Sequence, residues 1–412
     1  MTAPGPPADL RGRFVPLLAV TAAGALAIRI WAALTLDHPV VQGDAMTFHQ
    51  VAQHLADGEG FRAAFDHVPT AEHPPLWELV LAAADLVGGN GYTTHRLIGA
   101  LIGTLTVIAT GLLGRRVAGD AVGVVAAVLA AVNPMLWGAD VSLMSEPLYG
   151  LLLVCALLVA TRPPSVRDAA ALGALIGLAA LTRGEAVGLL VLLVVPLLWR
   201  RWKPLAAAFA ACALVIAPWT IRNLVTFDAP VLISTNANTV WIGANCPETY
   251  AGSLVGHWSF RCFEKIRPGE DEAQWSVRQR RDGLDYALDH TGRWPAVVRA
   301  RLARTFELHD FGQSLYLNAN EGRAVKPLRW GIRFTWALLV LAAIGAVLLR
   351  RRRAPLLVVL APIALVVALS VLVYGMTRFR FAAEPSLCVL AAASLAALPW
   401  ARTTTRSGTS RT

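Results

Sequence analysis

Residues 355–374 read Pro-Leu-Leu-Val-Val-Leu-Ala-Pro-Ile-Ala-Leu-Val-Val-Ala-Leu-Ser-Val-Leu-Val-Tyr, without a single charged side chain. A helix of about 20 such residues can cross the hydrocarbon core of a bilayer. Nine similar stretches occur along the chain, at about 14–36, 96–114, 119–139, 143–161, 168–182, 185–199, 204–221, 329–349 and 381–399. The pattern predicts an all-α polytopic membrane protein with about ten transmembrane helices.

The composition of the whole chain agrees with this fold class. Of 412 residues, 56% are hydrophobic and only 16% are charged, whereas soluble proteins carry about 25% charged residues. An eleventh apolar stretch, 76–87, is short and contains Glu78 and Asp85. We therefore predict that 76–87 is an interfacial or re-entrant helix and not a span.

The basic residues predict the orientation of the chain. If the N-terminus is inside, every short arginine cluster lies on the inner side, at 11–13, 115–116, 162–167, 200–203, 350–353 and 402–411. The positive-inside rule therefore predicts that both termini are cytoplasmic. The same rule explains the net charge of +10 without a nucleic-acid partner. Abundant Ala, Val, Leu and Arg with only three lysines indicates a bacterial source, and hence the bacterial cytoplasmic membrane.

This topology divides the chain into five parts. We expect a cytoplasmic tail at 1–13, a transmembrane core at 14–221 with an outer loop at 37–95, an extracytoplasmic cap loop at 222–328, C-terminal transmembrane helices at 329–400 and a tail at 401–412. The cap should contain helices over 270–290 and 293–308. All nine histidines fall in the two outer segments, which favours polar chemistry on the outer face.

Two acidic positions stand out in the first outer loop. Asp44 begins a segment in which Phe48, Val51 and Ala52 share one face, which predicts an amphipathic surface helix. Asp44 would also suit the N-cap position of that helix. Glu72 and His73 precede two prolines that fix a rigid corner; the alternative is an ordinary solvated turn.

Three charged residues occur where a membrane protein disfavours them. Glu146 lies about one turn into the apolar run 143–161. A carboxylate inside a membrane segment is energetically costly, so its presence indicates a functional role. Arg378 and Arg380 lie at the outer end of the last spans, against the positive-inside trend. An anionic ligand such as a phosphate would explain them; the alternative is pairing with lipid headgroups or with Glu384.

The cysteines and the nucleotide motifs complete the sequence features. Cys246 and Cys262 share the outer cap loop, which faces an oxidising compartment, so we predict a disulfide between them. The chain has no GxxxxGK[ST] or GxGxxG motif, so we expect no nucleotide cofactor.

Nine short features, in this order, resemble the GT-C superfamily of membrane glycosyltransferases. The most similar members are the bacterial relatives of the protein O-mannosyltransferases and of the lipid A aminoarabinose transferase, a glycosyltransferase family 39-like group. The matching features are Asp44, Ala52-x-x-Leu55-x-x-Gly58-x-Gly60, His73-Pro74-Pro75-Leu76, Gly114-Arg115-Arg116, Ser145-Glu146-Pro147, Leu181-Thr182-Arg183, Trp219-Thr220-Ile221-Arg222-Asn223, Ser234-Thr235-Asn236, and Arg378-Phe379-Arg380 before Glu384-Pro385.

The resemblance implies an inverting transfer of a hexose or pentose from a polyprenyl-phosphate sugar to a glycan, lipid or protein acceptor on the outer face. It implies catalytic roles for Asp44, as base or metal-linked carboxylate, and for Glu146. Glu72 and His73 fall where relatives contact a divalent metal or the phosphate, although relatives often have Lys in place of His73.

The residues suggest how such a reaction would be supported. A base must accept the proton of the acceptor hydroxyl, and cations must stabilise the departing phosphate. We expect Asp44 to be the base, and Arg222, Arg378, Arg380 and His73 to bind the donor phosphate. The alternatives are a transporter or flippase for a lipid-linked glycan, and an inactive GT-C-like scaffold in envelope assembly.

Overall fold

The computed structural model describes residues 12–36, 43–320 and 323–398. Within these ranges the chain is helical, and the only β-type pairing is a single antiparallel bridge between Arg62 and Pro69. The predicted all-α fold class is therefore confirmed. Most of the predicted tail at 1–13 and all of the tail at 401–412 lie outside the described residues.

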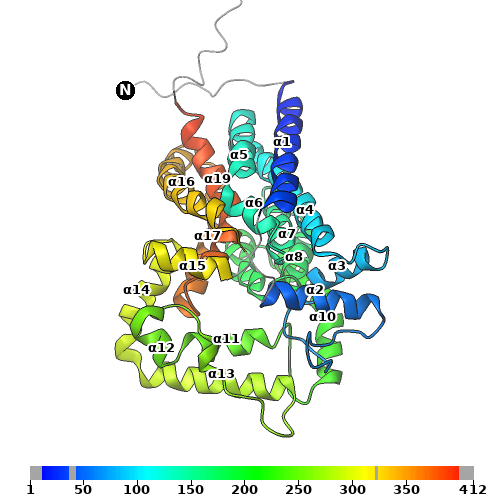
Figure 1. Ribbon diagram of the computed structural model, residues 1–412. Coiled ribbons are helices and arrows are strands. Elements are labelled where there is room, and N and C mark those ends of the chain that lie inside the picture. The colour runs from blue at the N-terminus through cyan, green and yellow to red at the C-terminus, as the bar shows by residue number, and fades with distance from the viewer. Residues whose placement is uncertain (1–11, 37–42, 321–322, 399–412) are drawn as a thin grey trace, which may run out of the picture.

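The core is a set of roughly upright apolar helices, with α1, α5, α16 and α19 at one end (Figure 1). The core elements are α1 (Phe14–Thr35), α4 (Tyr92–Ala118), α5 (Asp120–Val132), α6 (Pro134–Asp140), α7 (Glu146–Ala160), α8 (Val166–Ala180), η1 (Gly184–Val187), η2 (Leu190–Val194), α9 (Val195–Leu198), α10 (Trp202–Thr226), α16 (Val325–Arg351), α17 (Leu356–Leu372) and α19 (Glu384–Leu395).

Each of the ten predicted spans coincides with helix, but the helices differ in length. Four of them, α1, α4, α10 and α16, are long and apolar enough to cross a membrane, or five spans if the bent pair α5 and α6 counts as one. The protein is therefore a multi-pass membrane protein by its helices. The count of ten spans stays a prediction.

The bend between α5 and α6 has a local cause. The two helices meet at 58°. Pro134 cannot donate the helical hydrogen bond that would continue α5, and the Asn133 side chain instead caps α6 by accepting from the Met135 amide at 3.0 Å. The chain thus ends one apolar helix and starts another within the stretch 119–139, which the sequence pattern predicts as a single span.

Small residues allow the core helices to pack backbone against backbone. A methyl group added at Gly173 in α8 would lie 1.9 Å from the Ala208 carbonyl oxygen of α10, and one at Gly345 in α16 would lie 1.8 Å from the Leu390 carbonyl oxygen of α19. Close approach through small residues is how helices associate in lipid, where burial of apolar surface provides little driving force.

The segment 43–95, most of the predicted first outer loop, forms a separate layer across the ends of these helices. It contains α2 (Asp44–Ala56) and α3 (Leu76–Asp85), and α2 lies across the upright helices (Figure 1). The apolar face of α2 packs Phe48 and Ala52 against Trp77 and Leu81 of α3, which confirms the predicted amphipathic helix. The N-cap interpretation of Asp44 is wrong, because Gly43 occupies that position and Asp44 is the first helical residue.

The second outer segment forms the cap, and its helices α11, α12 and α13 lie at the end of the molecule opposite α1 and α5 (Figure 1). Its elements are α11 (Asn236–Ala244), α12 (Pro247–Tyr250), η3 (Gly252–Leu254), η4 (Phe260–Cys262), α13 (Glu272–Asp289), η5 (Thr291–Arg293), α14 (Trp294–Thr305) and α15 (Phe311–Asn320). The two predicted cap helices match α13 and α14.

The cap is attached to the end of α17. Thr305 and Ser370 share a hydrogen bond of 2.8 Å between their hydroxyl oxygens, and Arg301 donates to the Val371 carbonyl oxygen at 3.0 Å. After α17, the chain forms α18 (Thr377–Arg380) and η6 (Phe381–Ala383) before it enters α19. These contacts hold the segment between α17 and α19 directly against the cap.

A disulfide between Cys246 and Cys262 closes a 16-residue loop of the cap. We expect a membrane-impermeant thiol reagent to leave both cysteines unlabelled in intact cells and to label both after reduction, as measured by mass spectrometry of the peptides. Cys155 serves as an internal control, because it is a free cysteine in α7 that reduction should not affect. Labelling of Cys246 and Cys262 without reduction would contradict the pairing.

Candidate active site

Asp44 stands at the start of α2 on the wall of a cavity of about 1230 Å³. Its side chain keeps 27% of its surface exposed. The preceding residue, Gly43, has a φ of 59°, in the left-handed region that a side chain disfavours. The glycine lets the chain turn sharply into α2, so the first carboxylate of the helix faces the cavity.

Arg378 joins the two predicted catalytic acids. Its Nη1 donates to Asp44 Oδ2, and its Nε donates to Glu146 Oε1. Glu146 is fully buried at the start of α7, so an unpaired charge there would be costly. One guanidinium from α18 thus connects the outer loop to the first turn of a core helix.

A second arginine, Arg183, holds Glu146 from the other side. Its Nη1 lies 3.2 Å from the same Glu146 oxygen, while its Nε donates to Glu185 at 2.6 Å. Two guanidinium groups therefore share one buried carboxylate. The sequence places Arg183 in a conspicuous charged turn between two short apolar stretches, but we did not predict it as a site residue.

His73 faces Asp44 from the corner at Pro74-Pro75. Its Nε2 lies 3.7 Å from Asp44 Oδ1 and 3.9 Å from Glu72 Oε1, and this buried nitrogen has no hydrogen-bond partner among the described residues. The corner is also tied to the cap, because the amides of Thr235 and Asn236 donate to the carbonyl oxygens of Ala71 and Glu72 at 2.9 and 3.3 Å. These contacts argue against the alternative of a solvated turn.

The charges in this cluster shift the protonation of its acids in opposite directions. Burial would raise the pKa of Asp44, but the charge and hydrogen bond of Arg378, with the charge of Arg183, hold that pKa well below its ordinary value. Burial, with Asp44 and Glu272 nearby, raises the pKa of Glu72 to about 8. Burial also lowers the pKa of His73. The cluster thus combines an ionised Asp44 with a neutral imidazole.

Metal binding at the predicted position stays a prediction, because Asp44, Glu72 and His73 do not form a group whose ligand atoms all lie within 4.8 Å of one another. Asp44, Glu72 and His73 present two carboxylates and one imidazole, which are the ligand types that zinc and similar ions take. The unpartnered Nε2 of His73 is directed at both carboxylates. A cation here would also relieve the repulsion between the two acids.

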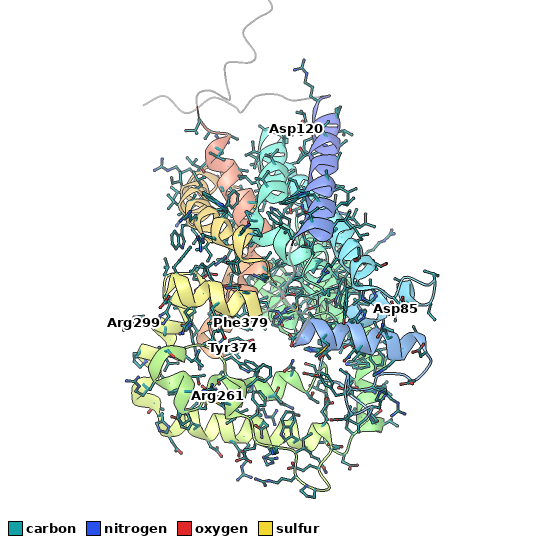
Figure 2. The ribbon with its side chains drawn as sticks, in the orientation of Figure 1. Asp85, Asp120, Arg261, Arg299, Tyr374 and Phe379 are labelled. Carbon is teal, nitrogen blue, oxygen red and sulfur yellow. A yellow bond between two sulfur atoms is a disulfide. The ribbon has the colours of Figure 1, made fainter. Side chains whose placement is uncertain are left out.

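Aromatic rings form much of the part of the cavity wall that the cap and the segment after α17 contribute. Trp258 contacts Phe260, Phe263 and Tyr374, with ring centroids 4.2, 5.4 and 6.5 Å apart. Tyr374 and Phe379 lie between the core and the cap (Figure 2), and their rings are 4.7 Å apart. Carboxylates reach the cavity from both segments, Asp44, Asp66 and Glu72 from 37–95 and Glu270, Asp271 and Glu272 from the cap, whereas the aromatic residues come from the cap and from Tyr374 after α17.

Arg380 does not reach this cavity, although only one residue separates it from Arg378. Its side chain is fully buried, with Nε 2.7 Å from Glu384 Oε1, Nη1 2.8 Å from the Thr305 carbonyl oxygen and Nη2 3.1 Å from the Thr335 hydroxyl oxygen. Pairing with Glu384 was the alternative that the sequence left open. In this structure it accounts for Arg380.

We expect Arg380→Leu to destabilise the protein by about 3–5 kcal/mol, because Glu384 would be left as a buried charge without its cation. Thermal unfolding in detergent measures this effect. Arg380→Leu combined with Glu384→Leu should recover much of the lost stability, since both charges are then removed. Equal loss in the single and double variants would contradict a charge-pair role.

Arg222 also lies outside the cluster. Its guanidinium donates to the Thr70 and Phe61 carbonyl oxygens at 2.8 and 3.3 Å, and it lies 4.9 Å from the centre of the Trp219 ring. The arrangement fixes the strand-like segment between α2 and the His73 corner. Glu272 of α13, which was not predicted, supports the same segment by accepting from the Ala71 amide at 3.1 Å.

Comparison with known proteins gives one family match and several structural matches. Residues 72–233 match the sequence model of the family described as dolichyl-phosphate-mannose-protein mannosyltransferase. This segment includes Glu72, His73, Glu146 and Arg183 but neither Asp44 nor Arg378. No curated protein sequence is significantly similar to the chain.

Two solved structures of the archaeal oligosaccharyltransferase from Archaeoglobus fulgidus share the fold. The complex of AglB with an inhibitory peptide and a dolichol-phosphate has a TM-score of 0.54 at 14% identity, over 93% of this chain and 50% of that chain. The complex with zinc and sulfate has a TM-score of 0.52 at 16% identity, over 92% and 48%. The chain spans about half the length of these proteins.

A third structure is more distant. ArnT from Cupriavidus metallidurans, bound to undecaprenyl phosphate, has a TM-score of 0.43 at 17% identity, over 94% of this chain and 78% of that chain. This score is too low to contribute to the comparison of folds. By its fold and its family match, the chain resembles the GT-C superfamily of membrane glycosyltransferases, as its motifs predict.

Proposed function

We propose that this protein is an inverting glycosyltransferase that moves a sugar from a polyprenyl-phosphate donor to an acceptor on the outer face of the bacterial cytoplasmic membrane. The observation that carries the proposal is the bridge from Arg378 to both Asp44 and Glu146 at the wall of the cavity. With these proposed roles, a base and a phosphate-binding cation would lie next to each other, which sugar transfer from a phosphodiester requires.

Asp44 is the proposed base. The acceptor oxygen attacks the anomeric carbon of the sugar from the face opposite the phosphate, and its proton passes to the Asp44 carboxylate. The bond between the anomeric carbon and the phosphate oxygen breaks, and its electron pair leaves with the polyprenyl phosphate. Arg378 keeps Asp44 ionised in the free enzyme. When the donor phosphate engages Arg378, its hold on Asp44 weakens and the carboxylate becomes a stronger base.

Arg378 is the proposed phosphate ligand, and His73 is positioned to contact the same phosphate from the other side of Asp44. Arg183 would keep Glu146 in place while Arg378 engages the donor. For Arg222 and Arg380 we propose supporting roles, because backbone carbonyls and Glu384 occupy their donors. Both are therefore proposed to position the site and not to bind the phosphate.

A divalent metal held by Asp44, Glu72 and His73 would add Lewis-acid stabilisation of the departing phosphate. Two observations support this proposed metal site. The three side chains are of types that bind metals, and His73 Nε2 has no hydrogen-bond partner among the described residues. The AglB structure with zinc and sulfate shows that a protein of this fold was solved with such an ion.

The membrane arrangement is part of the same proposal. Ten spans with both termini inside would put the loop at 37–95 and the cap at 222–328 on the outer face. The rest of 14–221, together with 329–400, would form the transmembrane core. The apolar tail of the donor would lie between core helices and its phosphate at their outer ends, near Arg378.

The lining of the cavity favours a glycan among the three acceptor classes. Besides Asp44 and Glu72, the described lining residues include Asp66, Glu270, Asp271 and Glu272, and Arg378 is the one basic residue among them. Carboxylates accept hydrogen bonds from sugar hydroxyls, and aromatic faces such as Trp258 pack on the apolar faces of sugar rings. An anionic acceptor would be repelled by this wall.

Mass spectrometry of lipid-linked sugars from cells with and without the protein tests the function. We expect one polyprenyl-phosphate sugar to accumulate in its absence and one envelope glycan to lose the same sugar. Cells that produce only the Asp44→Asn variant should show the same accumulation. Normal glycans in those cells would instead favour the transporter or scaffold alternatives, for which the chemistry of Asp44 is not needed.

A further inference from the structure

We propose that the first outer loop contains a zinc site, made by His54, Glu59 and His67, that is separate from the Asp44 cluster and does not depend on the proposed function. One ligand atom from each of the three side chains lies within 4.8 Å of the others. Two imidazoles and one carboxylate form a ligand set that zinc takes in proteins, with a remaining position for water.

The protein atoms around these side chains satisfy them poorly. His67 Nδ1 lies 3.4 Å from Glu59 Oε2, and His54 Nδ1 lies 3.3 Å from the Arg62 carbonyl oxygen, both at the long end of hydrogen bonding. The two imidazole rings lie side by side with centroids 4.5 Å apart. A shared metal ion would satisfy both rings and the carboxylate at once.

The backbone brings the three ligands together in a defined way. His54 lies in the last turn of α2, and Glu59 follows where the chain reverses through Gly58 and Gly60, both with positive φ. His67 sits in a hairpin closed by the bridge between Arg62 and Pro69. The His67 backbone has a φ of 51°, uncommon for a residue with a side chain, and Arg62 Nη1 donates to its carbonyl oxygen at 2.6 Å.

A metal at this position would link the end of α2 to the cavity wall. α2 carries Asp44 at its opposite end, and the hairpin contributes Ala63, Asp66, Val68 and Pro69 to the cavity lining. Because the ion would join two segments that otherwise meet through a few long hydrogen bonds, it would fix the position of the hairpin relative to α2.

A zinc titration tests the site. The full-length protein in detergent is first freed of metal with a chelator. Zinc is then added, and its binding is measured by competition with a coloured chelator. We expect the parent protein to bind about one zinc per chain more than His67→Gln or Glu59→Gln, because each variant removes one of three ligands. His309→Gln, which changes an exposed histidine of the cap, should bind as the parent does. Asp44→Asn should retain the site, which separates it from the metal position at Asp44, Glu72 and His73.

Proteolysis gives a second readout that activity does not influence. Zinc should slow cleavage within 59–69 in the parent protein and leave the cleavage of His67→Gln unchanged. Without metal, the parent protein and His67→Gln should unfold at the same temperature, because the His67 side chain is exposed. Identical zinc titration of the parent and His67→Gln, or equal protection of both by zinc, would overturn the proposal.

Discussion

Asp44→Asn should reduce sugar transfer by about 10²–10⁴-fold, the usual contribution of a positioned general base. Asparagine keeps the shape of the side chain and an oxygen that can accept from Arg378, but it cannot take the proton of the acceptor hydroxyl. The measurement is turnover by purified protein in lipid nanodiscs, with the donor identified by the mass spectrometry described above.

The matched control for this prediction is Asp66→Asn. Asp66 is an exposed carboxylate of the same cavity wall, so the substitution changes the charge of the cavity equally and leaves Asp44 intact. We expect a much smaller loss of turnover from Asp66→Asn, because asparagine can still accept a hydrogen bond from a sugar hydroxyl, and unchanged thermal unfolding from both variants. Near-parental turnover by Asp44→Asn would remove Asp44 from the role of base.

Arg378→Gln should also abolish most transfer, by about 10²–10³-fold, because the departing phosphate loses a preorganised cation. This substitution has a second effect that must be separated from the first. Glu146 is buried and would be left with Arg183 alone, which should lower stability by about 1–3 kcal/mol. Turnover and thermal unfolding therefore need to be measured on the same preparations.

The double variant Arg378→Gln with Glu146→Gln separates the two effects. Removing both charges should restore stability toward that of the parent, while transfer stays low because the phosphate ligand is still missing. Arg261→Lys provides a control for arginine substitution in the cap, since Arg261 is highly exposed and its contact with Glu248 is 3.7 Å long. Recovery of transfer in the double variant would show that Arg378 acts only by balancing Glu146.

Local patterns were sufficient to predict much of the fold. The helix α2 is predicted because Phe48, Val51 and Ala52 recur at helical spacing, and the structure buries this face against α3. The break at Pro134 has an equally local cause, because proline lacks the donor that a continuous helix needs. Such features depend on neighbouring residues only, so the sequence contains them in full.

The difference between Arg378 and Arg380 could not be predicted in the same way. Both are arginines in one short motif, with equal reason to bind an anion. The structure turns Arg378 toward Asp44 and Arg380 toward Glu384, because α18 is held between α14 and α17. Which side of a four-residue helix faces the cavity depends on partners more than 70 residues away in the chain. The same holds for Arg183, whose partner Glu146 lies in another helix.

The bridge made by Arg378 also bears on how the protein is synthesised. The ribosome makes Asp44 and Glu146 long before Arg378, which is separated from them by 334 and 232 residues. Until the last hairpin enters the membrane, the nascent chain carries a buried acid that has only Arg183 for a partner. A chain truncated before α18 would therefore lack the cation that joins the two acids. The proposed active site can form only after the ribosome has made most of the polypeptide.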